Sequence, residues 1–306
     1  MTPFFSVVIP LFNKEHFIGS TIQSVLFQTH QDFEIIVVND GSTDDSLKKV
    51  KAINDKRITI YTIKNQGASH ARNYGASKAN ADYIAFLDAD DYWNSGFLRH
   101  IKKLIDKHPE EKVFASALKI KKNKKEYNAT YKNLPQQVND CVVDYFETSL
   151  DHSILHCSSS VFKKTAFLDL GGFDENLKTS EDTDFWIRTG LKHKIAFIIK
   201  PLATHKVVRH SLSKTNRELF KAIDFKKYTT QVTQNTFAQI FIQKNIFASA
   251  IRYKLIGDKK NLLTLKTQLD SKLLSLKQKT LLALPKNVLL FVINLNNKIS
   301  SKKSYF

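Results

Sequence analysis

The sequence is poor in cysteine, glycine, proline and long apolar runs. With few glycines and prolines, the composition argues against a wholly disordered protein. The only cysteines are Cys141 and Cys157, too few for a disulfide framework or a thiolate zinc site. We therefore expect the protein to reside in the reducing cytoplasm. No stretch of about 18 uninterrupted apolar residues occurs, which argues against a membrane-spanning helix. No basic region precedes the first apolar run, so residues 1–13 predict a strand and not a signal peptide.

Acidic residues are also scarce, with 29 Asp and Glu against 47 Lys and Arg in 306 residues. The resulting net charge of +18 is uneven, because residues 214–306 alone carry +14. Such a field favours anionic partners, either lipid head groups or nucleic acid. The lysines of this region alternate with leucines and not with aromatic residues, so we expect no nucleic-acid binding.

Residues 1–100 alternate between short apolar runs and helix-like stretches. This pattern predicts a parallel sheet covered by helices on both faces. Ligands of such sheets bind at the carboxyl ends of the strands, where this sequence places polar clusters. The predicted strands are 5–10, 33–38, 58–63 and 83–87, and the predicted helices are 16–28, 42–53 and 69–79.

Three carboxylates follow the fourth apolar run directly, at Asp88, Asp90 and Asp91. Acidic groups this close repel one another, and a hard divalent cation such as Mg²⁺ or Mn²⁺ would relieve the repulsion. A solvated turn with a helix cap is the alternative, because aspartate is common in turns.

Two further segments are candidates for nucleotide binding. Asp40 ends the second predicted strand, where a carboxylate can accept hydrogen bonds from a ribose or a base. Gly67 permits close approach of a ligand to the backbone, and Arg72 can hydrogen-bond a base carbonyl or a phosphate. A plain strand-to-helix turn and a surface arginine at a helix start remain the alternatives.

Glu181 and Asp182 begin a predicted helix, whose dipole favours a carboxylate at that position. A carboxylate held there can accept a proton from a sugar hydroxyl. The alternative is simple capping of the helix, with Ser180, Thr183 and Asp184 stabilising its first turn.

Taken together, these segments resemble the inverting family-two glycosyltransferases of the GT-A fold. The matching segments occur in the family's order and span roughly residues 4–213. They are residues 6–13, 38–44, 65–73, 86–91, 171–175 and 180–182.

For the donor, the resemblance implies that Pro10 and Asp40 line the nucleoside pocket. Arg72 would reach the base or the diphosphate. Asp88 and Asp90 match the family's DxD motif, with Asp90 nearest a Mn²⁺ or Mg²⁺ ion.

For the acceptor, the resemblance implies that Asp182 is the general base and Glu181 its orienting partner. Trp186 would pack behind them or line the acceptor site. His205 and His210 both match the family's closing segment, and His205 is the candidate metal or phosphate ligand.

The implied fold is an α/β, Rossmann-like mixed sheet flanked by helices, with a helical C-terminal extension. Residues 1–213 would form the catalytic domain, with a nucleotide-sugar half to about residue 100 and an acceptor half from 101 to 213. Its implied activity is sugar transfer from a nucleotide-diphosphate sugar, with UDP favoured, to a glycan or lipid-linked acceptor in bacterial surface polysaccharide synthesis. An inactive scaffold or a basic membrane- or nucleic-acid-binding protein is the alternative.

Residues 214–306 are predicted to be helical. Leu262, Leu269 and Leu276 recur every seventh residue and predict one apolar helical face. With the +14 charge, this region could attach the protein to the inner face of the plasma membrane. A helical cap on the catalytic domain, or a homo-oligomer contact through the leucine face, is the alternative.

Overall fold

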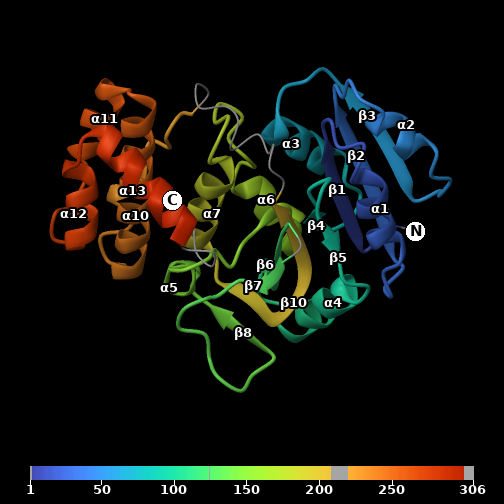
Figure 1. Ribbon diagram of the computed structural model, residues 1–306. Coiled ribbons are helices and arrows are strands. Elements are labelled where there is room, and N and C mark those ends of the chain that lie inside the picture. Colours follow the sequence, from blue (N-terminus) through green and yellow to red (C-terminus); the bar gives the residue numbers. More distant parts are fainter. Residues whose placement is uncertain (1, 124, 208–219, 300–306) are drawn as a thin grey trace. The chain divides into compact units, whose positions relative to one another are not determined.

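The computed structural model describes residues 2–123, 125–207 and 220–299, excluding the side chains of 294 and 296–299 (Figure 1). Residue contacts divide the chain into two units, residues 1–215 and 216–306. The boundary predicted after residue 213 lies outside the described residues, and so does His210.

The first unit is built on one ten-stranded sheet among the described residues. Along the sheet the order is β3-β2-β1-β4-β9-β6-β10-β5, with β7 on β6 and β8 on β10. The strands are β1 (Phe5–Leu11), β2 (Phe33–Asp40), β3 (Ile58–Ile63), β4 (Tyr83–Phe86), β5 (Tyr92–Trp93), β6 (Val113–Lys122), β7 (Lys125–Asn128), β8 (Asp140–Val143), β9 (Ser160–Lys163) and β10 (Ile195–Val207).

This sheet is mixed, which confirms the predicted fold class. The predicted parallel half is present, because β1 pairs in parallel with both β2 and β4, and β2 with β3. β9 then runs antiparallel between β4 and β6. Consequently the carboxyl ends of β1, β2 and β4 lie at one edge of the sheet.

The helices of the first unit connect these strands. α3 packs on β1 and β2 so closely that a Cβ at Gly75 would lie 2.4 Å from Cγ1 of Val8. The helices are α1 (Ile18–Leu26), α2 (Ser46–Lys51), α3 (Ala68–Lys78), α4 (Phe97–Lys107), α5 (Tyr145–Thr148), α6 (Lys164–Asp169) and α7 (Glu181–Lys192).

An aromatic cluster fixes α7 on the sheet. Trp186 is buried and stacks on Phe162 of β9, with ring centroids 6.0 Å apart. Phe173 and Phe185 pack beside them, with centroids 4.5 Å apart. The first turn of α7 is therefore held by a buried, rigid support.

Helices are the only regular elements among the described residues of the second unit. None of the described helices is long and apolar enough to cross a membrane. The described helices are α9 (Lys226–Thr229), α10 (Thr236–Ile256), α11 (Lys259–Lys266), α12 (Leu276–Ala283) and α13 (Lys286–Ile299).

The predicted leucine face does not form, because residues 267–275 between α11 and α12 are not helical. Gln243 of α10 donates to the carbonyl of Gln268 at 3.0 Å and accepts from the backbone of Asp270 at 2.9 Å. Ser275 then starts α12 through a capping box. Tertiary hydrogen bonds and a new helix cap thus interrupt the heptad pattern.

Candidate active site

Hydrogen bonds join the loops that follow β1 and β2. The side chain of Asn13 accepts from the backbone of Thr43 at 2.8 Å. The backbone of Lys14 donates to the hydroxyl of Ser46 at 2.7 Å. These bonds hold the two loops in place beside the carboxylates that follow β4.

Arg72 of α3 joins the two acidic segments that the sequence placed far apart. Its guanidinium donates to Asp88 at 2.7 Å and to Glu181 at 3.4 Å. Arg72 is only 6% exposed, and its guanidinium carbon lies 5.2 Å from the ring centroid of Phe173. A buried cation therefore brings the end of β4 and the start of α7 into one site.

The two acids bonded to Arg72 titrate differently. Burial alone would raise the pKa of Asp88, but the charge of Arg72 holds that pKa below its usual value. Burial raises the pKa of Glu181, and the neighbouring charge of Asp182 adds to the effect. Asp88 is therefore the ionised partner, while Glu181 is closer to taking up a proton.

Asp182 is the exposed member of the acidic pair at the start of α7. Its Oδ1 accepts from the backbone N–H of Thr183 at 2.6 Å. Ser180 does not cap the helix, since it has a left-handed backbone (φ 67°) and its side chain makes no cap hydrogen bond. The backbone thus turns sharply before presenting Asp182 to solvent.

Asp90 pairs with a residue that the sequence analysis did not single out. Nζ of Lys14 lies 2.5 Å from Oδ2 of Asp90. Burial raises the pKa of Asp90, as does the charge of Asp91, and Lys14 offsets part of the shift.

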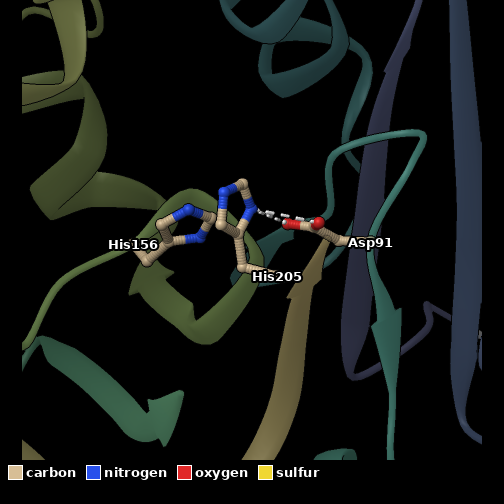
Figure 2. Close-up of side chains that lie close together, drawn as sticks. All are labelled: Asp91, His156 and His205. Atoms are coloured by element: carbon tan, nitrogen blue, oxygen red, sulfur yellow. Dashed lines mark hydrogen bonds and ion pairs between the residues drawn. The ribbon is translucent and has the colours of Figure 1, made fainter. Parts of the chain in front are cut away.

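Asp91 is buried and accepts several hydrogen bonds. Nδ1 of His205, on β10, lies 3.2 Å from both of its oxygens (Figure 2). The Ser158 hydroxyl donates to Oδ2 at 2.5 Å, and the backbone of Lys206 donates to Oδ1 at 2.8 Å. Asp91 therefore orients His205, much as carboxylates orient histidines behind metal ions.

Asp91, His156 and His205 each offer a ligand atom within 4.8 Å of the others, so these described residues could hold a metal ion (Figure 2). The rings of His156 and His205 are 4.7 Å apart between centroids. Burial lowers the pKa of His156, whose Nδ1 accepts from the backbone of Ser158. Two nitrogens and one oxygen suit Mn²⁺ or Zn²⁺, whereas Asp88 and Asp90 offer the oxygen ligands that Mg²⁺ prefers.

The residues predicted to line the nucleoside pocket lie at the ends of β1 and β2. Asp40 is buried, and its two oxygens accept from the backbones of Gln66 and Gly67, each at 2.8 Å. Gly67 has a φ of 100°, which disfavours other residues. Pro10 is half-buried in β1 opposite Val38 of β2. Asp40 thus shapes the loop that leads to Arg72.

Lys14, His156 and Ser158 are the contacts that sequence reasoning missed. Lys14 lies just after β1, so the rule that ligands meet at strand carboxyl ends could have identified it. His156 and Ser158 lie in and beside a short helical turn (Cys157–Ser159) that carries no comparable signal.

Comparisons with known proteins identify the family of this chain. The family model described as glycosyl transferase family 2 matches residues 6–171. An uncharacterized glycosyltransferase of Rickettsia conorii is 31% identical over 210 residues, covering 66% of this chain and 32% of that protein. The minor teichoic acid biosynthesis protein GgaB of Bacillus subtilis is 29% identical over 269 residues, covering 82% of this chain and 29% of GgaB. The alignments thus span only part of these longer relatives.

The fold also matches a solved structure. S. aureus TarS, residues 1–349 in complex with UDP-GlcNAc, aligns with a TM-score of 0.60 and 19% identity. The alignment covers 96% of this chain and 80% of that one. At this identity the match shows the shared fold.

Proposed function

Because the chain belongs to glycosyl transferase family 2, we propose that it transfers a sugar from a UDP-sugar to a glycan or lipid-linked acceptor of a bacterial surface polysaccharide, with inversion at the anomeric carbon. The observation that carries this proposal is the bridge from Arg72 to Asp88 and Glu181, which puts the DxD segment beside the general-base candidate. UDP and UDP-GlcNAc bound to TarS support the donor class, and the name of GgaB supports the acceptor class.

In the proposed reaction, Asp182 accepts the proton of the acceptor hydroxyl as its oxygen attacks the anomeric carbon. Direct displacement needs one base, and Asp182 is the exposed carboxylate of the pair. Glu181, hydrogen-bonded to Arg72, holds the start of α7 in place. Trp186 supports this turn from the buried side and does not line the acceptor site.

A divalent cation would be held by Asp88 and Asp90, with His205 as a further ligand oriented by Asp91. When bound, it supplies positive charge to the leaving diphosphate. Arg72, buried beside Asp88, adds a fixed positive charge to the same place.

A thermal-shift screen of nucleotide sugars with and without Mn²⁺ tests the donor assignment. A UDP-sugar at about 100 times its Kd should stabilise the protein by about 2.7 kcal/mol and raise Tm by roughly 5 °C. GDP- and dTDP-sugars are the matched controls and should give smaller shifts. If no nucleotide sugar shifts Tm, the proposed activity is wrong.

We further propose that the protein attaches to the cytoplasmic leaflet through α13. Among the described side chains of this helix, four exposed apolar ones recur at helical spacing, while Leu289 is buried. Residues 271–306 contain seven lysines and no Asp or Glu, which complements an anionic surface. The exposed side chains are Val288, Phe291, Val292 and Leu295.

Co-sedimentation with phosphatidylglycerol vesicles tests this attachment. Replacing Phe291 and Leu295 together with glutamate should abolish binding, because both apolar burial and charge attraction are lost. The same replacement at Leu263 and Leu276, which are also exposed, is the control and should retain most of the binding. Equal binding of both variants would contradict a role for α13.

A further inference from the structure

Each carboxylate of the segment after β4 has a cationic or ionisable partner from the chain itself. Asp88 pairs with Arg72, Asp90 with Lys14, and Asp91 with His205. The mutual repulsion of these acids, which suggested a divalent cation from the sequence, is therefore already reduced by side chains.

The three partners differ in how firmly they are held. Arg72 is buried and bonded to a second acid, Glu181, and His205 lies between Asp91 and the ring of His156. The side chain of Lys14 is 24% exposed and carries its charge on a flexible four-carbon stem. Its backbone, by contrast, is anchored to Ser46. The ammonium of Lys14 can thus leave Asp90 without moving the loop.

We propose that Lys14 is an exchangeable counter-ion of Asp90, which competes with a divalent metal ion and passes to the donor diphosphate when metal and donor bind together. This inference rests on the proposed function, because the second partner of the ammonium is the diphosphate of the nucleotide sugar. No bond is made or broken in the exchange: one ion pair replaces another.

The exchange has a direct electrostatic consequence. Without a nucleotide, a metal ion must displace the Lys14 ammonium from Asp90, so the metal alone binds weakly. With a nucleotide present, the displaced ammonium gains a phosphate oxygen in place of the carboxylate, and metal and nucleotide strengthen each other's binding. Lys14 therefore makes the binding of metal and donor cooperative, and this favours their entry as one complex.

Mn²⁺ binding to the full chain, followed by the electron paramagnetic resonance signal of free Mn²⁺, tests the proposal. Lys14→Met should bind Mn²⁺ alone at least about tenfold more tightly than wild type, since a competing charge is gone. Lys14→Arg keeps the charge and should retain weak binding. Lys102→Met removes a lysine that is ion-paired with Asp106 at the surface, and should behave as wild type.

The second arm adds UDP. In wild type, UDP should tighten Mn²⁺ binding strongly, and in Lys14→Met this enhancement should fall by about tenfold. Unchanged Mn²⁺ affinity in Lys14→Met, with a native thermal transition, would overturn the exchange. If wild type bound Mn²⁺ but never UDP, the proposed donor would fail, whereas the effect of Lys14 on Mn²⁺ alone would still be measurable.

Discussion

Replacing Asp182 with asparagine is expected to lower sugar transfer by about 10² to 10⁴-fold, the usual contribution of a general base. Asparagine has nearly the same shape, and its side-chain oxygen can still accept from the backbone of Thr183, so the first turn of α7 is preserved. The loss therefore falls on proton transfer and not on folding. Donor binding, measured by calorimetry with a UDP-sugar, should stay within about twofold of wild type, because the role proposed for Asp182 is on the acceptor hydroxyl.

The matched control is Asp169→Asn, which removes the same charge from an exposed position at the end of α6. It should leave both transfer and donor binding unchanged. If Asp182→Asn lost donor binding, Asp182 would belong to the donor pocket. If it retained full turnover, another group would have to accept the proton.

Replacing Arg72 with methionine is expected to have the largest effect on stability. The change keeps much of the side-chain volume but leaves Asp88 and Glu181 beside each other without their cation. Removing one partner of a buried ion pair costs about 3–5 kcal/mol, and because 24% of Asp88 and 19% of Glu181 are exposed, we expect a cost near the lower end, about 3 kcal/mol. For a protein of this size that corresponds to a fall in Tm of roughly 6 °C.

Arg57→Met is the control for this prediction. Arg57 pairs with Asp55 at 2.7 Å, but 23% of its side chain is exposed against 7% for Arg72, so its loss should cost about 1 kcal/mol or less. Arg72→Lys should not restore stability, because a single ammonium lacks the planar fork that spans both acids. Equal Tm values for the Arg72 and Arg57 methionine variants would mean that Arg72 does not hold the site together.

The parallel half of the sheet could be predicted from the sequence because its strands are short, buried apolar runs separated by helices. The antiparallel strand β9, which lies between β4 and β6, could not, since its pairing depends on segments far apart in the chain. The leucine heptad gave a wrong prediction for a related reason. The spacing of leucines carries no information on tertiary hydrogen bonds. Here the side chain of Gln243 bonds the backbone of Gln268 and Asp270, where the helix would have continued.

The candidate site, like the fold, could be predicted only in part. Asp88, Asp90 and Asp182 were recognisable because acidic residues follow a buried strand or begin a helix. Their pairing with cations could not be predicted, because Lys14 is 76 residues from Asp90 and Arg72, itself a candidate, is 109 residues from Glu181. The acids could therefore be identified from the sequence, with a metal ion or a solvated turn as the two explanations of their spacing, and the fold adds counter-charges that neither explanation included.

A crystal structure of the intact protein with UDP and Mn²⁺ would test most directly whether Asp88, Asp90, Arg72 and Asp182 form one donor and acceptor site. We expect the diphosphate and the anomalous signal of Mn²⁺ to lie between Asp88, Asp90 and Arg72, with the carboxylate of Asp182 exposed beside them. Clear density for UDP and Mn²⁺ elsewhere on the chain, with Asp182 remote from both, would contradict it.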